Sequence, residues 1–418
     1  MDNLIINGGN KISGKISISG SKNAVLPIMT ATIISPGIYI LKNVPELRDT
    51  YTMKRLLEMI GAKIKFKNNI MEINTESCDN PVASYDVVKT MRASFYVLGP
   101  FMSRFNHAQV SLPGGCAWGP RPINFHLDAL EQLGAKVSLK NGNIIAKGKL
   151  KGCTINFKTR SVGATGNTIM ASICAQGTTI INNAAMEPEI ESLCVFLQHM
   201  GADINGIGTD QIIINGKDVL KNNVKYSIIP DRIEAGTYLI AAAITHGDLT
   251  IVNVDPSHLK VLLNLLEKSG MHIECQDKEI RIRSKNNNIS PVNITTDVYP
   301  GFPTDLQAQW MAYMSQANGS SIIVENIYSD RFTHIAELSR LGAKIKLQEN
   351  KAYINGKNIL VAAPVMSTDI RASASLIIAA LVAKGKTEIS RVYHIDRGYE
   401  NIENKLSILG IDIIRKKE

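Results

Sequence analysis

The segment at residues 113–122 places a thiol beside a guanidinium in a loop. It reads PGGCAWGPRP, and three glycines and three prolines in ten residues exclude a helix or a central strand, because glycine is too flexible and proline locks φ and lacks the N–H. Arg121 follows Cys116 by five residues, and nearby positive charge favours the thiolate, the reactive form of cysteine. The alternative is an incidental cysteine, since most unpaired cysteines are small buried hydrophobes. A loop that is not apolar favours a reactive thiol.

A lysine and an asparagine stand together where an apolar helix should begin. The run at residues 21–27 reads SKNAVLP. At a helix N-terminus, Lys22 and Asn23 would direct an ammonium, an amide and free backbone N–H groups toward one anion. The alternative is that Ser21 caps the helix and Lys22 is solvated. On these residues alone, the structural alternative is favoured.

Arginines recur at the starts of apolar helices or beside turns, where paired N–H groups suit carboxylates and phosphates. They are Arg92, Arg121, Arg232, Arg331, Arg371 and Arg397. Any one of them alone is explained as a surface ion pair.

Asp305 lies in the segment 300–309, PGFPTDLQAQ, near a predicted helix start. It is either a first-turn carboxylate worth a few tenths of a kcal/mol to the helix or a general base for a hydroxyl proton.

Length and composition indicate a soluble protein of two domains. The 418 residues suit two domains of roughly 200 residues each, and 44% hydrophobic with 20% charged residues is typical of globular chains. Apolar runs such as 376–383 are far shorter than the roughly 20 residues that span a bilayer. Gly8 and Gly9 interrupt the N-terminal segment before a signal-peptide core could form. We therefore expect a cytoplasmic protein.

The cysteines and the net charge exclude further classes. Six cysteines occur without a CxxC pair, so neither a zinc site nor a disulfide framework is indicated. The net charge of +9 could suggest nucleic acid, but Lys and Arg are spread along the chain without interleaved aromatic residues. An anionic small substrate explains this charge as well. We expect reduced thiols, no metal and no nucleic-acid partner.

An internal repeat of roughly 70 residues organises the chain. Six times an apolar-periodic helix ends in glycine and is followed at once by an alternating strand; the glycines are Gly61, Gly134, Gly201, Gly270, Gly342 and Gly410. Each glycine is predicted to adopt φ > 0 just after its helix. A second, Ala- and Ile-rich helix per unit, as at 235–243 and 372–383, should be buried. We predict an α/β fold of two groups of three units, with buried helices inside a shell of sheets.

Two N-terminal segments are ambiguous. The strand at residues 3–7 precedes the first unit and could pair with either half. The run at 9–15, GNKISGK, has the spacing of a phosphate-binding loop, but Ile16 stands where a Mg²⁺-binding Ser or Thr is required. We interpret it as a hairpin turn between two strands. The division between the halves is predicted near Pro230.

These motifs together resemble a known family. Gly114-Gly115-Cys116 followed by Arg121-Pro122 and His126, the SKN run at Lys22 and the segment around Asp305 are similar to those of UDP-N-acetylglucosamine 1-carboxyvinyltransferases, the enolpyruvyl transferases that open peptidoglycan synthesis. The resemblance covers essentially the whole chain. It implies a two-domain inside-out α/β barrel, with domains at 21–229 and at 1–20 plus 230–418. The chain would cross twice between them, making a hinge and a substrate cleft.

The resemblance also implies roles for particular residues. The catalytic residues would be Cys116, Asp305, Lys22 and Arg397. Phosphoenolpyruvate would be held by Lys22, Asn23, Arg121, Arg371 and Arg397. UDP-N-acetylglucosamine would be held by Asn23, Arg92, Arg121, Pro122, Ile123, Asn124, Phe125, Ser161, Val162, Gly163, Asp305 and Ile327. No cofactor is implied, and Arg331 and Arg232 are weaker candidates outside this set.

The sequence departs from the family pattern at three positions, and two alternative functions are open. Asn124 stands where the family usually has Asp, Thr159 stands where it has a lysine, and Trp118 is bulkier than the usual aliphatic residue. The nearest rival enzyme is the shikimate-pathway enolpyruvyl transferase, which lacks the cysteine loop. A further alternative is an inactive relative that binds a nucleotide sugar, against which the intact set of catalytic residues argues. The resemblance therefore favours the peptidoglycan enzyme.

Overall fold

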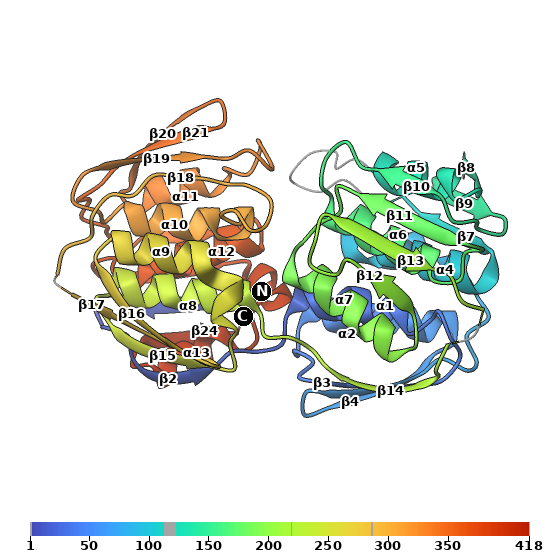
Figure 1. Ribbon diagram of the computed structural model, residues 1–418. Helices are drawn as coiled ribbons and strands as arrows, with labels where there is room; N and C mark the ends of the chain where they lie inside the picture. Colours follow the sequence, from blue (N-terminus) through green and yellow to red (C-terminus); the bar gives the residue numbers. More distant parts are fainter. Residues whose placement is uncertain (1, 113–122, 219, 286, 418) are drawn as a thin grey trace. The chain divides into compact units, whose positions relative to one another are not determined.

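The computed structural model describes residues 2–112, 123–218, 220–285 and 287–417 (Figure 1). Contacts divide the chain into two compact units. The first unit is residues 20–229, and the second unit combines residues 1–19 with residues 230–418. The chain passes from one unit to the other at Ser19–Gly20 and at Ile229–Pro230.

Within the described residues, each unit holds three four-stranded sheets of one design, in which an edge strand pairs in parallel and the other neighbours are antiparallel. The first unit's sheets, in spatial order, are β14 (Asn223–Ser227), β3 (Ile38–Lys42), β5 (Ile70–Asn74) and β4 (Lys63–Lys67); β6 (Val82–Ala83), β7 (His107–Ser111), β9 (Asn143–Lys147) and β8 (Lys136–Lys140); and β10 (Thr154–Asn156), β11 (Thr178–Asn182), β13 (Gln211–Asn215) and β12 (Asp203–Asn205).

The second unit repeats this arrangement. Its sheets are β2 (Ser13–Ser17), β15 (Asp248–Val252), β17 (Glu279–Ser284) and β16 (Met271–Gln276); β18 (Ile294–Thr295), β19 (Ser320–Val324), β21 (Lys351–Asn355) and β20 (Lys344–Gln348); and β22 (Pro364–Met366), β23 (Lys386–Ser390), β1 (Asn3–Asn7) and β24 (Asp412–Lys416). In the last sheet, β1 takes the place that a local hairpin strand takes in the other five.

Three helices fill the centre of each unit. They are α1 (Lys22–Ala31), α4 (Leu98–Phe105) and α6 (Val162–Ser172) in the first unit, and α8 (Arg232–Ile244), α10 (Gln307–Met314) and α12 (Ile370–Ala380) in the second. Every residue of α10 is buried, as is all of α8 after Arg232. Figure 1 shows α8, α10 and α12 lying inside the second unit's strands. The prediction of buried helices within a shell of sheets is therefore confirmed.

Other helices bury only one face or are short. The six one-sided helices are α2 (Arg48–Ile60), α5 (Asn124–Gln132), α7 (Pro188–His199), α9 (Lys260–Lys268), α11 (His334–Arg340) and α13 (Ile402–Ile408). The short ones are α3 (Tyr85–Val88) and the 3₁₀ helices η1 (Arg92–Val97), η2 (Pro256–Leu259), η3 (Thr304–Leu306) and η4 (Val392–Arg397). Among the described helices, none is long and apolar enough to cross a membrane.

The six repeat glycines adopt the backbone conformation predicted for them. Their φ values run from 88° at Gly410 to 111° at Gly61. At the first of them, the Gly61 N–H donates to Glu58 O at 3.1 Å and the Ala62 N–H donates to Leu57 O at 3.0 Å. These bonds satisfy carbonyls at the helix end, and an L side chain resists this φ. The repeat read from the sequence is confirmed.

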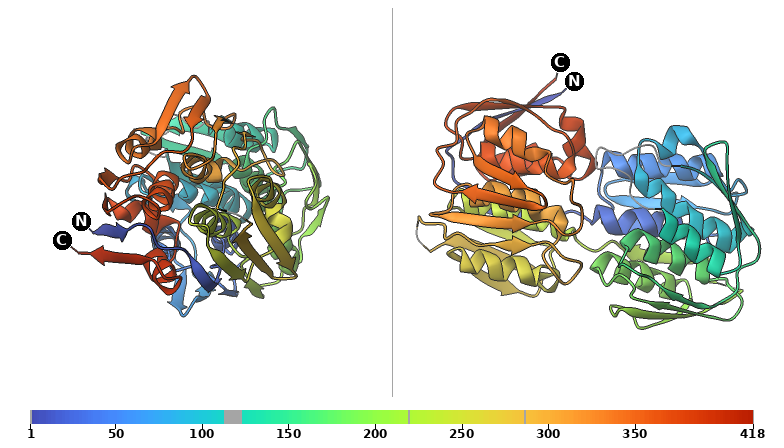
Figure 2. Two further views of the ribbon diagram at one scale, coloured as in Figure 1. Left: turned by 90° about the vertical axis from the view of Figure 1, so that its left-hand side faces the viewer. Right: turned by 90° about the horizontal axis from the view of Figure 1, so that it is seen from above.

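The N-terminal strands correct one prediction. β1 lies between β23 and β24, with Leu4 opposite Ile389 and Asn3 opposite Lys416, so both termini lie side by side (Figure 2). β2 instead pairs in parallel with β15 in a different sheet. The interpretation of residues 9–15 as a hairpin turn is therefore wrong, because the segment links two sheets. Partners more than 200 residues away decide its path, and local turn chemistry does not report them.

A close approach between α4 and α6 gives a stability prediction. A Cβ added at Gly99 would lie 2.4 Å from Asn167 O and 3.2 Å from Ala171 N. Gly99→Ala must push the two helices apart, so we expect the free energy of unfolding to fall by about 1–3 kcal/mol in urea denaturation. Gly177→Ala is the control, because its Cβ would meet nothing within 4 Å and only its φ of 90° resists substitution. An equal loss in both variants would contradict the close approach.

Candidate active site

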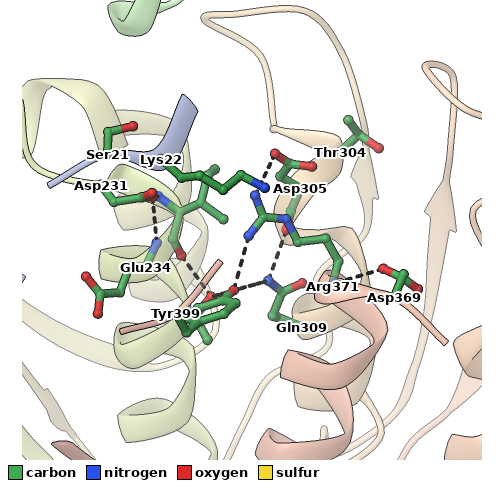
Figure 3. A network of polar contacts seen from close by, with 12 residues as sticks. Ser21, Lys22, Asp231, Glu234, Thr304, Asp305, Gln309, Asp369, Arg371 and Tyr399 are labelled. Atoms are coloured by element: carbon green, nitrogen blue, oxygen red, sulfur yellow. Dashed lines mark hydrogen bonds and ion pairs between the residues drawn. The ribbon is translucent and has the colours of Figure 1, made fainter. Parts of the chain in front are cut away.

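Asp305 lies in η3, directly before the buried helix α10, and is clamped by two arginines. Arg331 Nη2 donates to Asp305 Oδ1 at 2.6 Å. Arg371 Nη2 donates to Asp305 Oδ2 at 2.9 Å (Figure 3). The two arginine side chains are 9% and 8% exposed, whereas that of Asp305 is 25% exposed. The carboxylate therefore keeps an open side while its charge is doubly neutralised.

The clamp determines the protonation state of Asp305. Burial favours the neutral carboxyl, but the charges of Arg371 and Arg331 outweigh burial and hold the pKa of Asp305 well below its usual range. The group is therefore ionised at neutral pH and can only accept hydrogen bonds. A carboxylate that merely stabilised the first turn of a helix would not require two nearly buried guanidinium groups.

A buried glutamate fixes Arg331 and the turn that carries Ile327. Arg331 Nη1 donates to Thr304 Oγ1 at 2.9 Å, and that hydroxyl donates to Glu325 Oε2 at 2.9 Å. Glu325 Oε1 accepts the N–H of Ile327 at 2.8 Å. The sequence-predicted Ile327 and the clamp around Asp305 are thus joined through one carboxylate. Arg331 had no role in the set implied by resemblance, and its recurrence beside a turn was the only sequence signal.

Arg371 and Arg397 lie on elements that pack together. Asp369 caps α12 by accepting the N–H of Arg371 at 2.8 Å, which places the guanidinium at the start of that buried helix. Arg397 ends η4, which packs against α12. The second unit therefore brings together Asp305, Arg371 and the element carrying Arg397. Arg232, the first residue of α8, lies over the ring of Tyr299 at 5.5 Å.

In the first unit, Lys22 begins α1 as the sequence predicts. Ser21 accepts the Ala24 N–H at 3.4 Å, so it caps the helix. Lys22 Nζ lies 3.5 Å from Asp49 Oδ2, and the two side chains are only 12% and 6% exposed. The alternative of a solvated lysine is therefore wrong. Asn23 follows in the same first turn.

The predicted nucleotide residues on or next to α5, α6 and η1 lie around His126. Asn124 and Phe125 open α5, and Ile123 precedes them. Ser161 caps α6 by accepting the Ala164 N–H at 3.3 Å. Helix α6 packs against α5 and also against η1, which begins at Arg92. Val162 and Gly163 are the first two residues of α6. A Cβ on Gly163 would lie 3.2 Å from His126 Cε1, so these segments meet closely.

His126 itself is a neutral structural link. Its Nδ1 lies 2.9 Å from Asn167 Nδ2, and Asn167 Oδ1 accepts the Gly99 N–H, so the Asn167 amide donates to His126. Burial, aided by the charge of Arg92, lowers the pKa of His126 to about 4. The residue sets the spacing of α5 and α6 without adding charge.

Three predicted residues, Cys116, Arg121 and Pro122, lie outside the described residues. The five cysteines that the structure describes are Cys78, Cys153, Cys174, Cys194 and Cys275. Among the described side chains, no group of three or more His, Cys, Asp or Glu residues could hold a metal ion. The second unit's part of the candidate site consists of arginines and the partly exposed Asp305 carboxylate, which suits an anionic substrate and transfer of a proton.

Comparisons with known proteins agree with this arrangement. The sequence profile of the EPSP synthase (3-phosphoshikimate 1-carboxyvinyltransferase) family matches residues 6–406. The enolpyruvyl transferase NikO from Streptomyces tendae superposes with a TM-score of 0.91 at 24% identity over 100% of this chain and 99% of the other. EPSP synthase from Acinetobacter baumannii gives 0.78 at 18% identity over the full length of both. The chain therefore belongs to the EPSP synthase family of enolpyruvyl transferases, and the predicted fold class is confirmed.

Relatives at higher identity specify a group within this family. UDP-N-acetylglucosamine 1-carboxyvinyltransferase from Chlorobium luteolum is 52% identical over 100% of this chain and 99% of the relative. The protein of the same name from Geotalea uraniireducens is 51% identical over the full length of both. These relatives confirm the family resemblance read from the sequence motifs.

Proposed function

We propose that this protein transfers enolpyruvate from phosphoenolpyruvate to the 3′-hydroxyl of UDP-N-acetylglucosamine and releases phosphate, the first committed step of peptidoglycan synthesis. The observation that carries the proposal is 52% identity, over the whole chain, to a UDP-N-acetylglucosamine 1-carboxyvinyltransferase. Both substrates are small anions, as the net charge of +9 favours. Because both are soluble metabolites, the proposed location is the cytoplasm.

Asp305 is the proposed general base. Each of its carboxylate oxygens accepts one arginine N–H and keeps a further lone pair, and the side chain is 25% exposed. The 3′-hydroxyl gives its proton to Asp305 as its oxygen forms a bond to C2 of phosphoenolpyruvate. The double-bond electron pair takes a proton at C3 from the Cys116 thiol. The product of this addition is a tetrahedral phospholactoyl intermediate.

Elimination completes the proposed reaction. C3 returns a proton to the Cys116 thiolate as the double bond forms again and the bond from C2 to the phosphate oxygen breaks. The departing phosphate takes the proton that Asp305 had accepted, so both side chains return to their starting states. Lys22, Arg121 and Arg397 stabilise the charge that develops on the donor, with Asn23 and Arg371 also holding it. Within the described structure, the buried contact between Lys22 and Asp49 supports a fixed position for the Lys22 side chain in this role.

The nucleotide sugar is proposed to lie on the segments around α5 and α6. The free backbone N–H groups at the start of α6, next to Ser161, suit a diphosphate. Arg92 adds a cation at the start of η1. Arg121 and Pro122 precede Ile123, Asn124 and Phe125 and complete the proposed set, in which Asp305 and Ile327 bind the sugar.

A phosphate-release assay tests the function. Release is expected only when phosphoenolpyruvate and UDP-N-acetylglucosamine are both present, because the hydroxyl must add to C2 before phosphate can leave. Shikimate 3-phosphate is expected not to replace the nucleotide sugar. If it supports release, this chain is the shikimate-pathway enzyme that gives the family its name; if neither acceptor does, the chain is not a transferase for either.

A further inference from the structure

Three buried polar side chains meet behind the clamp on Asp305. They are Thr237 of α8, Gln309 of α10 and Tyr399, which follows η4; their exposed fractions are 3%, 0% and 2%. The hydroxyl groups of Thr237 and Tyr399 are 2.8 Å apart, and Gln309 Nε2 lies 3.2 Å from the first and 3.3 Å from the second (Figure 3). Polar groups in such a core need a reason, because burying them has a cost.

The direction of these hydrogen bonds can be assigned. Thr237 Oγ1 donates its single proton to Ile233 O, one turn earlier in α8, at 2.8 Å. The hydroxyl of Thr237 must therefore accept from Tyr399, whose own proton is thereby used. The lone pairs of Tyr399 are left for Gln309 Nε2 and for Arg371 Nη1, which lies 3.4 Å away. Burial outweighs the charge of Arg371 and raises the pKa of Tyr399, so the phenol stays protonated.

The guanidinium of Arg371 is thus held at two corners. Nη1 faces Tyr399 and Nη2 donates to Asp305 Oδ2. Because the group is planar and rigid, fixing one corner sets the direction of the other. Gln309 Nε2 also donates to the backbone carbonyl of Asp305 at 3.0 Å, so the same network holds the main chain of the carboxylate.

We propose that Tyr399, oriented by Thr237 and Gln309, is a positioning residue that aims Arg371 at Asp305 and thereby sets the proton affinity of the base. The inference rests on the proposed function for its kinetic test. Without the hydroxyl, Arg371 loses an acceptor and its contact with Asp305 loosens. The carboxylate then binds a proton more readily, and the guanidinium is less well placed for an anionic donor.

The charged groups around Asp305 limit the size of the effect. Arg331 reaches Oδ1 from the segment before α11, and Arg371 reaches Oδ2 from α12. Asp231, the cap of α8, acts on both Arg371 and Tyr399 through its charge, and Glu325 acts on Arg331 through Thr304. Since Arg331 is untouched, loss of the Tyr399 hydroxyl should weaken the clamp without abolishing it.

The experiment compares Tyr399→Phe with Tyr313→Phe. Tyr313 is an equally buried phenol of α10, and its hydroxyl pairs with that of Ser269 at 2.8 Å. Phosphate release is measured across pH for both, together with thermal unfolding. Tyr399→Phe is expected to raise the KM for phosphoenolpyruvate about tenfold, the lower range for a hydrogen bond to a charged group. The acidic limb of kcat/KM should move to higher pH, while Tyr313→Phe keeps wild-type kinetics at a similar melting temperature.

Thr237 supplies a second pair of variants. Thr237→Ser keeps the hydroxyl and should match the wild type, whereas Thr237→Val removes the acceptor of Tyr399 and should shift KM and the pH profile in the same direction as Tyr399→Phe. This pair decides the question if Tyr399→Phe fails to fold. The inference would be overturned if the wild type is active and the variants leave both the KM for phosphoenolpyruvate and the pH profile of kcat/KM unchanged. An inactive wild type would instead count against the proposed function, and ¹³C NMR titration of the Asp305 carboxyl would then test the clamp alone.

Discussion

Fosfomycin, a small phosphonate epoxide that resembles phosphoenolpyruvate, is expected to alkylate Cys116 alone among the six cysteines. Its epoxide carbon reacts with a thiolate, and the C–O bond opens as the C–S bond forms. The cations that are proposed to bind the donor would favour the thiolate at Cys116. The glycines at 114, 115 and 119 predict, from the sequence, a loop whose backbone angles change when UDP-N-acetylglucosamine binds, so labelling should be faster with the nucleotide sugar present.

The other cysteines supply the selectivity. Burial raises the pKa of Cys78 and Cys174 to about 11 and that of Cys194 to about 12; the pKa values of Cys153 and Cys275 are also raised. At pH 7, a thiol of pKa 11 is ionised in about one molecule in 10⁴, so its nucleophile is scarce. Peptide mass spectrometry after treatment, with and without UDP-N-acetylglucosamine, reads out the labelled site.

Cys116→Asp is the matched variant. It keeps a proton donor but presents a poor nucleophile to the epoxide, so we expect some remaining turnover together with resistance to fosfomycin. Labelling at a different cysteine, or inhibition of Cys116→Asp equal to that of the wild type, would show that the segment 113–122 is not the catalytic loop.

Asp305→Asn is expected to reduce turnover by a factor on the order of 10²–10⁴, which is the usual contribution of a positioned general base. Binding of UDP-N-acetylglucosamine should stay intact. The amide keeps the size and the hydrogen-bonding oxygen of the side chain but cannot take the hydroxyl proton. Turnover by phosphate release and binding by calorimetry separate the two effects.

A matched control exists on the surface of the same unit. Asp248 of β15 accepts two bonds from Arg281, at 2.9 and 2.8 Å, in an exposed pair. Asp248→Asn should leave turnover unchanged. Near-normal turnover of Asp305→Asn would leave only a structural role for that carboxylate.

The pH dependence of stability gives a further test of the clamp. Because the pKa of Asp305 is depressed, its ion pairs stabilise the wild type above the ordinary Asp pKa of about 3.9 and are lost as pH falls. The difference in free energy of unfolding between the wild type and Asp305→Asn should therefore become smaller in acid.

Several features could be predicted because a local residue pattern specifies each of them. They are the repeat, the buried helices and the starts of α1 and α12. A glycine after an apolar-periodic helix specifies one φ region, and a helix apolar on every face specifies burial. The link between β1 and β2 could not be predicted, since the partners of these strands, β23 and β15, are far away in the chain.

The candidate site also has a part that could be predicted from the sequence and a part that could not. Asp305 and Arg371 were candidates from residue type and position, but the direct hydrogen bond between them depends on tertiary packing. The contacts that hold Asp305 from its other side, through Arg331, Thr304 and Glu325, also depend on it. Thr237 and Gln309 left a weak signal, as polar residues within helices that are mostly apolar. Tyr399 left none, because a single tyrosine two residues after Arg397 does not reveal that its hydroxyl faces Arg371.

The position of β1 also bears on how the protein is made. The three sheets of the first unit draw only on residues 38–227, so they can all form once that stretch has left the ribosome. β1 and its apolar residues Leu4, Ile5 and Ile6 leave first but cannot be flanked on both sides until β24, about 400 residues later, has been synthesised. At 5–20 residues per second, that delay is on the order of 20–80 s. The sheet that contains β1 is therefore completed only when nearly the whole chain has been synthesised, much later than the sheets of the first unit.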